Sequence, residues 1–447
     1  MIDLQHRSNT SVPFDIVERV RAQYEQFPYP RYPLLAKPFW QDGVGGSSLF
    51  SRTLMHKNHL LFATGQDTLI LGCGDMQPYI FSCLEPKGAR VFGIDLSRSS
   101  IKRANFRLKA NFRKAYLMVG DLDSYLVSGS PYNFSHIDAF GVLHHLVNPG
   151  QTIAAIYERL APGGTLRVMI YNAKARSWIR EIAKIFCLLG YDYRYKQDLR
   201  QARQLLVLAK KHYHLLAQHL ASMGKSLLTN DSRFIDAFFH EREVHLSYTS
   251  WLSHFAKTGF LHLGFFDRYG ELDHLANPLW QPPASATMEA LIDQGLFRGN
   301  FELYFAKPGG EKQAGSSRLF ASLRPPRLWF TFPETASLSW PKQLFIWQKY
   351  QKRLSSFCID DPKSFPPMPL ASWQRLARLG AVMPGEGTWQ DKLLAPIAKE
   401  APLYESPVKT KTVSDDLRVF IENRLQKLAI TTLERRRDLI FARLSRL

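Results

Sequence analysis

Cysteine is scarce in this sequence, and the few cysteines form no recognisable framework. Among 447 residues only Cys73, Cys83, Cys187 and Cys358 occur, and no two of them make a C-x-x-C pair. This spacing argues against a disulfide scaffold and against a zinc knuckle, so we expect no bound metal ion. It favours a reducing compartment, which predicts a cytoplasmic protein.

Long hydrophobic runs are absent as well. No stretch approaches the roughly 18 consecutive apolar residues of a membrane-spanning helix. The N-terminal sequence MIDLQHRSNTSVPFD lacks the apolar centre of a signal peptide. We therefore expect no transmembrane segment, in agreement with a cytoplasmic location.

Acidic residues are few relative to basic ones. Lysine and arginine number 58 and aspartate and glutamate 39, which gives a formal net charge of +19. This excess favours an anionic partner such as RNA, a membrane surface or a phosphorylated substrate. Solvated lysines on an ordinary basic enzyme explain it equally well. The hydrophobic content of 45% is that of a globular protein, and the length allows two or three domains.

One stretch combines a strand, a glycine turn, a helix and a second strand: TLILGCGDMQPYIFSCLEPKGARVFGID. The apolar run 69–71 is too short for a helix and is typical of a buried parallel strand. Gly72 and Gly74 follow it, and the second apolar run, 90–94, leads to Asp95. In a doubly wound sheet such glycines let the backbone approach a nucleotide, and the acid binds its ribose. The stretch therefore predicts a nucleotide-like cofactor.

The alternation of strands and helices continues along the chain. We predict strands over residues 115–119, 136–140, 165–171, 261–267 and 301–307, and helices over residues 99–111, 149–160, 249–258 and 286–294. Strands separated by helices of this length predict a sheet covered by helices on both faces. The expected fold class is therefore α/β with a doubly wound sheet.

The helix predicted over 99–111 has a clear start and a cationic surface. Ser97 precedes it and is a good N-cap. Its cations, together with those just beyond its end, are Lys102, Arg103, Arg107, Lys109, Arg113 and Lys114. We expect them to form a solvated face that complements the negative end of the helix dipole.

Five motifs together resemble the class I S-adenosylmethionine-dependent methyltransferases. They read LILGCG, GIDLS, FGVLHHLVNPG, LAPGGTLRVMIYN and, upstream, YEQFPYPRYP, and together they look like one bacterial branch of that superfamily. The resemblance is close over 68–171 and looser as far as 308. It implies a seven-stranded Rossmann-like sheet in which 301–307 is an antiparallel edge strand. It also implies S-adenosylmethionine as cofactor and a methyl acceptor that the motifs do not identify.

The same resemblance assigns residues to cofactor binding. It implies that Gly72 and Gly74 line the methionine part of the cofactor. It also implies that Asp95 holds the ribose and that Asp121 faces the adenine amino group. The full set implied for the cofactor is Gly72, Cys73, Gly74, Asp95, Leu96, Asp121, Leu122 and Gly141.

Three histidines are candidates for the chemistry of the acceptor. An oxygen or nitrogen acceptor of a methyl group usually needs a base within hydrogen-bond reach. His144 and His145 follow strand 136–140 at the edge where ligands of such sheets bind, and His240 is a candidate for orienting the acceptor. The alternative for each is a structural histidine that fixes a loop. A zinc-protease motif is not formed, because His245 falls one residue too late after His240.

A basic insertion, about 172–258, separates the fifth and sixth predicted strands. Residues 172–225 contain eleven lysines or arginines and three acids. We predict helices over 178–189 and 199–223, with tyrosines and histidines interleaved among the cations. Such a surface suits base stacking and phosphate contacts with RNA, and a plain helical lid is the alternative.

Two further segments flank the predicted catalytic domain, 68–308. Residues 1–67 predict an N-terminal cap, helical and extended, with a helix over 14–27. Within that helix, Tyr24 is either a ligand contact or a packing residue. Residues 311–447 predict a basic, mostly helical C-terminal domain.

Three functions remain open from the sequence. The leading one is a methyltransferase with an unidentified acceptor. The second is an RNA-binding or scaffold protein that keeps the fold without turnover, since Ile70 and Met76 replace an acid and a glycine of the superfamily pattern. The third is a nicotinamide-dependent oxidoreductase, which Gln77 disfavours because it stands in place of the third glycine of a dinucleotide fingerprint. The sequence predicts neither the acceptor nor the oligomeric state.

Overall fold

The computed structural model describes residues 11–32, 48, 51, 55, 60, 61, 63, 65, 67–85, 88–127, 133–224, 226–265 and 284–310. These residues fall into two compact units. We call residues 31–172 and 245–310 the sheet unit, and residues 11–30 and 173–244 the helical unit. The predicted C-terminal domain and most of the predicted N-terminal cap lie outside the described residues.

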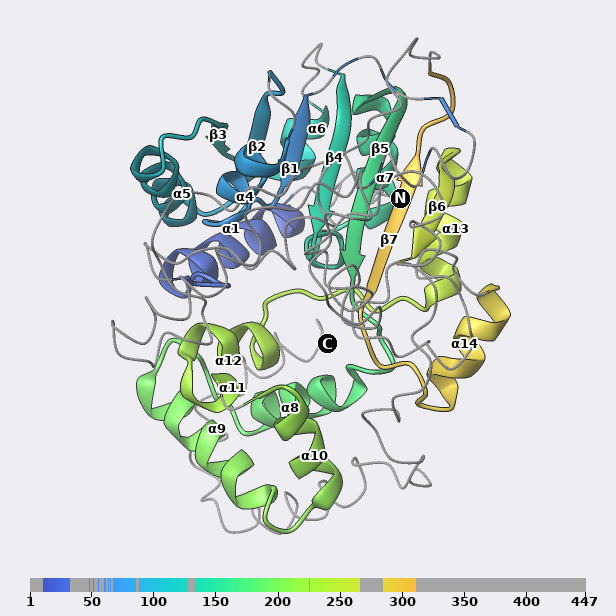
Figure 1. Ribbon diagram of the computed structural model, residues 1–447. Helices are drawn as coiled ribbons and strands as arrows, with labels where there is room; N and C mark the ends of the chain where they lie inside the picture. Colours follow the sequence, from blue (N-terminus) through green and yellow to red (C-terminus); the bar gives the residue numbers. More distant parts are fainter. Residues whose placement is uncertain are drawn as a thin grey trace, which may run out of the picture. The chain divides into compact units, whose positions relative to one another are not determined.

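The sheet unit is built on seven strands (Figure 1). They are β1 (Thr68–Leu71), β2 (Val91–Asp95), β3 (Tyr116–Val119), β4 (Phe134–Phe140), β5 (Leu160–Ile170), β6 (Leu261–Phe265) and β7 (Phe301–Ala306). Their order is β3-β2-β1-β4-β5-β7-β6. The first five strands are mutually parallel, whereas β7 runs antiparallel to both of its neighbours. This confirms the predicted α/β fold with a doubly wound, Rossmann-like sheet of seven strands.

The predicted edge position of β7 is wrong. β7 pairs with β5 on one side, where Met169 is opposite Glu302, and with β6 on the other, where Phe265 is opposite Leu303. Every residue of β7 is buried, as expected for a strand hydrogen-bonded on both sides. The outer position beyond β7 belongs to β6.

Helices cover both faces of the sheet. On one face lie α4 (Gln77–Leu84) and α5 (Arg98–Ala110), which share a core with Ile70. On the other face lie α6 (Leu122–Val127), α7 (Pro149–Arg159), α13 (Tyr248–Thr258) and α14 (Ser285–Asp293). Leu69 and Leu71 join this second core, because successive side chains of a strand point to opposite faces. Burial on both faces accounts for the uniformly apolar sequence of β1.

α5 begins as predicted, but its cations do not all face solvent. The Ser97 side chain accepts a hydrogen bond from the backbone N–H of Ser100 at 3.1 Å. Arg107 is fully buried, with Nη2 3.3 Å from Oδ2 of Asp75, and Nε of Arg103 lies 2.9 Å from the same oxygen. The expectation of a solvated face is therefore wrong for these two arginines, which pair with a buried carboxylate.

The helical unit consists of α1 (Ser11–Gln26), α8 (Ser177–Leu188), α9 (Lys196–Ala209), α10 (His214–Ser222), α11 (Ser226–Thr229) and α12 (Asp231–Phe238). Its core is rich in aromatic rings, with Phe186, Phe234 and Phe239 at the centre. None of the helices in the described part of the chain is long and apolar enough to cross a membrane.

The single helix predicted over 199–223 is wrong, because two helices occupy this segment. α9 ends at Ala209, and Tyr213 has an extended backbone before α10 begins. The buried positions Leu205, Ala209, Leu216 and Leu220 continue at helical spacing across the break. Apolar periodicity alone therefore could not locate the end of α9.

Candidate functional site

The turn after β1 presents main chain without side chains at the carboxyl edge of the sheet. Gly72 and Gly74 have φ angles of +63° and +56°, which glycine adopts at no steric cost. A Cβ on Gly72 would lie 2.8 Å from Cγ2 of Val142, so this turn packs closely against the chain that follows β4. A Cβ on Gly74 would have no atom of the described residues within 4 Å, so among these residues open space lies beside Gly74. Strand order reverses between β1 and β4, which is where open α/β sheets bind ligands.

Asp95, the last residue of β2, is oriented by the same turn. Its Oδ2 accepts a hydrogen bond from the backbone N–H of Gly74 at 2.8 Å, and its Oδ1 accepts one from Ser97 at 2.8 Å. The side chain is half-buried. A carboxylate can accept about four hydrogen bonds, so two backbone donors fix its direction and it can still accept from a ligand hydroxyl.

Two residues of the turn direct their side chains into the protein. Met76 is buried in the core that contains Ile70, so its thioether does not fill the space beside Gly74. Cys73 is also buried there, and burial raises the pKa of its thiol well above the usual value. Its backbone N–H donates to the carbonyl of Ile94 at 3.0 Å. Cys73 is therefore a neutral packing residue of the turn.

Asp75, the residue after Gly74, anchors the turn to α5 through ion pairs. The guanidinium groups of Arg103 and Arg107 both contact its Oδ2. Burial raises the pKa of Asp75, and the two arginines act in the opposite direction. This ion-paired group fixes the chain directly after Gly74 without adding a side chain to the open space.

Asp121 lies at the same edge, two residues beyond the end of β3. Its Oδ2 accepts hydrogen bonds from the backbone N–H and the hydroxyl of Ser124, each at 2.8 Å, and so caps the start of α6. The N–H of Gly120 donates to the carbonyl of Asp95 at 3.0 Å and ties the ends of β2 and β3 together. The two predicted cofactor acids thus follow neighbouring parallel strands.

The remaining predicted cofactor residues differ in what they present. Leu96 is half-buried directly after Asp95, whereas the side chain of Leu122 is buried in the core. Gly141 has a φ angle of +79°, and its N–H donates to the carbonyl of Met169 at 3.0 Å. It therefore joins the end of β4 to β5.

His144 and His145 lie on η2 (Leu143–His145), a short 3-10 helix after β4. The His144 ring is fully buried and stacks on Tyr171, with centroids 3.7 Å apart. His145 is half-buried and meets the His144 ring edge-on at 4.2 Å. The sequence analysis missed Tyr171. A signal was present: Tyr171 comes one residue after β5, and the ends of the parallel strands β4 and β5 lie at the same edge of the sheet as the histidines.

A second polar cluster lies wholly within the helical unit. The hydroxyl of Tyr24, on α1, is 3.1 Å from Oδ1 of Asp236 and 3.1 Å from Nε2 of His240. The backbone N–H of Arg242 donates to Nδ1 of His240 at 3.0 Å, which leaves Nε2 to carry the ring hydrogen. The arrangement is a chain of hydrogen bonds in which His240 donates to Tyr24 and Tyr24 donates to Asp236.

Asp236 is the titratable end of this chain. It is only 7% exposed, and burial raises the pKa of its carboxyl to about 7, although Arg176 and the Tyr24 hydroxyl oppose this. Its charge therefore changes near neutral pH. The sequence analysis missed it because Tyr24 is 212 residues away, although a lone acid inside the aromatic run FIDAFF was a signal.

The structure thus distributes the predicted site residues over both units. The glycine turn, the two acids and the pair His144 and His145 belong to the sheet unit, and His240 belongs to the helical unit. α12 ends at Phe238, so His240 lies outside the helix. Within the described ranges no group of three or more histidine, cysteine, aspartate or glutamate side chains is placed to hold a metal ion.

Comparison with known proteins gives one domain match. The family described as a methyltransferase domain matches residues 69–166. This segment runs from β1 into β5 and contains the glycine turn, Asp95, Asp121 and the pair His144 and His145. It leaves out the helical unit.

Two curated proteins and one solved structure illustrate the similarity. An uncharacterized protein of Synechococcus sp. is 26% identical over 270 residues, which cover 58% of this chain and 62% of that protein. A ubiquinone biosynthesis O-methyltransferase of Nitrosospira multiformis is 27% identical over 134 residues, 29% of this chain and 50% of that protein. The chain therefore spans between half and two thirds of these relatives. PKMT2 from Rickettsia typhi is 17% identical, with a TM-score of 0.46 over 63% of this chain and 56% of that chain.

Proposed function

We propose that this protein is an S-adenosylmethionine-dependent methyltransferase whose cofactor binds at the carboxyl edge of β1, β2 and β3. One observation carries the proposal: open space beside Gly74, next to the Asp95 carboxylate that the Gly74 amide orients. These residues fit a nucleoside ligand, because main chain can approach it closely while a carboxylate accepts from its sugar hydroxyls. The methyltransferase-domain match over 69–166 supports the same assignment.

Each residue of this edge has a separate role in the proposal. Gly72 and Gly74 line the methionine part of the cofactor, and Asp95 accepts hydrogen bonds from the ribose. Asp121, already fixed by Ser124, faces the adenine amino group. When bound, the cofactor supplies a methyl group on a positively charged sulfur. The contribution of the chain is to bind, to orient and to accept a proton from the acceptor where one must leave.

The acceptor side of the proposal rests on His144 and His145 of the sheet unit. His145 is the candidate base, because it is half-buried at the end of β4, whereas His144 is fully buried and stacked on Tyr171. His144 then acts by holding its neighbour in place. His240 lies in the helical unit, where its ring is fixed by hydrogen bonds at both nitrogens, and its role toward the acceptor stays a prediction. A neutral imidazole is the form that can take up a proton from an oxygen or nitrogen acceptor.

Neither a fold without turnover nor a nicotinamide-dependent oxidoreductase gains support from the geometry of this edge. Ile70 and Met76 were the reason for the hypothesis of a protein that keeps the fold without turnover. Both are buried in the core and leave the turn open. Gln77 begins α4, where a dinucleotide fingerprint has the third glycine, so the nicotinamide alternative remains disfavoured.

A methyl-transfer assay tests the proposal. The full chain is incubated with S-adenosylmethionine carrying a tritiated methyl group and with a cell extract, which is then separated into RNA, protein and small molecules. We expect label in one fraction with the wild type and none with Asp95→Ala. Asp67→Ala is the matched control, because Asp67 precedes β1 at the opposite edge and pairs with Arg90. Label no higher than with heat-denatured protein would contradict the proposal.

A further inference from the structure

α9 carries three cations along one face of the helical unit. Lys196, Arg200 and Arg203 are spaced by four and three residues, which places them on the same side of the helix. Lys196 and Arg200 are exposed, and neither side chain makes an ion pair or hydrogen bond with the described part of the chain. Cations left unneutralised along one helix face attract anions.

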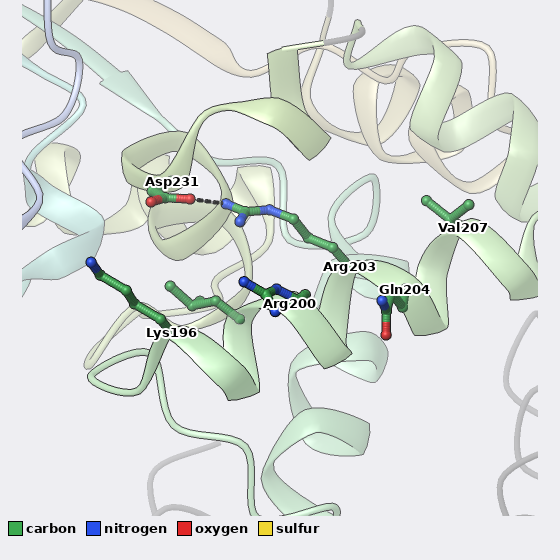
Figure 2. Close-up of a pocket in the computed structure, with 7 residues that line it drawn as sticks. Lys196, Arg200, Arg203, Gln204, Val207 and Asp231 are labelled. Atoms are coloured by element: carbon green, nitrogen blue, oxygen red, sulfur yellow. Dashed lines mark hydrogen bonds and ion pairs between the residues drawn. The ribbon is translucent and has the colours of Figure 1, made fainter.

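The same cations line a surface pocket of about 360 Å³ (Figure 2). Val207, which is 38% exposed, adds apolar surface, and Gln204 adds an amide, whereas Leu199 lines the pocket but is only 3% exposed. The volume lies within the range of about 300–1,000 Å³ that small-molecule sites occupy. The pocket is therefore large enough for one unit of a polymer and is more than a charged patch.

Arg203 and Asp231 form an ion pair on one side of the pocket. Nη2 of Arg203 forms an ion pair with Asp231, which lies at the start of α12, and Figure 2 shows the guanidinium directed at this carboxylate. The guanidinium also lies 4.7 Å from the centre of the Phe234 ring. Asp231 remains more than half exposed, so its carboxylate can accept from a ligand hydroxyl or amino group as well.

We propose that this pocket binds a ribonucleotide unit of single-stranded RNA. Lys196 and Arg200 bind the backbone phosphates, and Asp231 accepts from the 2′-hydroxyl or from a base amino group. The exposed side chain of Val207 packs against the base. Tyr195, which is 57% exposed and directly precedes Lys196, offers a further stacking surface.

The composition of the pocket favours RNA over other anions. An acidic peptide or a polyphosphate matches the cations but has no flat apolar face for Val207. A carboxylate among the cations repels further anionic groups and favours hydrogen-bond donors, which ribose and bases supply. The 2′-hydroxyl is the group that distinguishes RNA from DNA at such a site. RNA binding at this pocket is independent of the proposed methyl transfer.

Fluorescence anisotropy with a short labelled RNA of mixed sequence tests the site in the full chain. We expect the double variant Lys196→Ser/Arg200→Ser to bind roughly tenfold more weakly than the wild type near 0.15 M salt. The slope of log affinity against log salt should fall by about 1.4, since each phosphate contact on a single strand contributes about 0.7. The matched control, Lys102→Ser/Lys109→Ser, removes the same charge from exposed positions of α5 and should change the affinity less than twofold.

Circular dichroism melts check that both double variants fold, and we expect melts like that of the wild type, since all four positions are exposed. Equal RNA affinity of the wild type and Lys196→Ser/Arg200→Ser, or equal losses in the two double variants, overturns the site. DNA of the same sequence that binds as tightly as RNA contradicts the ribonucleotide assignment. A free mononucleotide that displaces the RNA at equal concentration would show that the pocket binds free nucleotides, which contradicts a site for an RNA strand. Polyglutamate binding with the same dependence on Lys196 and Arg200 contradicts nucleic acid altogether.

Discussion

The backbone N–H of Gly74 donates a 2.8 Å hydrogen bond to Oδ2 of Asp95, so the turn after β1 and the end of β2 position each other. A ligand that enters the open space beside Gly74 therefore meets a carboxylate whose direction is already set. Preorganisation of this kind lowers the cost of binding, because the acceptor group does not have to be ordered by the ligand.

Gly74→Ala tests the open space, and Gly88→Ala is its matched control. Both glycines have positive φ angles, and a Cβ on either would have no atom within 4 Å in the described part of the chain. Both variants should therefore lose about 1 kcal/mol of stability from backbone strain alone. Gly74→Ala should also weaken S-adenosylmethionine binding by about tenfold, or ~1.4 kcal/mol, in calorimetric titration. Equal cofactor affinities in the two variants would contradict the assignment of the turn.

Arg107→Met tests the buried support of the turn. The variant leaves the buried Asp75 carboxylate with Arg103 as its remaining partner, and we expect a loss of about 3 kcal/mol in the free energy of unfolding. Lys109→Met on the same helix is exposed and should change stability by less than about 0.5 kcal/mol. Urea denaturation measures both variants. Similar losses of stability in the two variants would contradict the buried ion pair and would favour the solvated face that the sequence predicted.

Asp236→Asn tests the titration of the buried carboxyl. Its pKa of about 7 lies above the value near 3.9 of an unfolded chain, so the native protein binds this proton more tightly. The stabilisation is complete below about pH 4 and is lost as pH rises through about 7. Asp236→Asn removes this dependence, so its stability relative to the wild type should rise by up to about 4 kcal/mol over that interval.

Chemical denaturation at a series of pH values measures this difference. Asp231→Asn, at an exposed position of the same helix, is the control and should keep the wild-type profile. Parallel profiles of Asp236→Asn and the wild type would show that Asp236 does not titrate in this range.

Tyr24→Phe tests the hydrogen-bond chain itself. The change removes the hydroxyl that contacts both Asp236 and His240, and a buried polar group that loses its partner costs about 1–3 kcal/mol. The double variant Tyr24→Phe/Asp236→Asn should lose less stability than the sum of the losses in the two single variants. The reason is that both changes break the same contact. Thermal melts of the four proteins measure the coupling. Strict additivity would mean that the two side chains act independently.

Local signals predicted much of the sheet unit. The apolar run of β1 and the N-cap of α5 depend only on neighbouring residues, and the structure confirms both. The edge where Asp95, Asp121 and His145 follow their strands was predictable too, because the ends of parallel strands meet at one edge. Their roles toward a cofactor or acceptor stay predictions.

Partners distant in sequence could not be predicted. Arg167, on β5, is fully buried between Asp138 of β4 at 3.1 Å and Glu302 of β7 at 2.7 Å. Burial raises the pKa of Asp138 to about 6, although Arg167 opposes this. Only the order of the strands brings these charges together, as only tertiary packing brings Tyr24 to Asp236. A single sequence contains no signal that pairs such residues.

Calorimetric titration of the full chain with S-adenosylmethionine tests the central claim most directly. We expect the wild type to bind the cofactor, Asp95→Ala to bind it at least about tenfold more weakly, or by ~1.4 kcal/mol, and Asp67→Ala to bind it like the wild type. A wild type that does not bind the cofactor, or an Asp95→Ala variant that binds it equally well, would contradict the account.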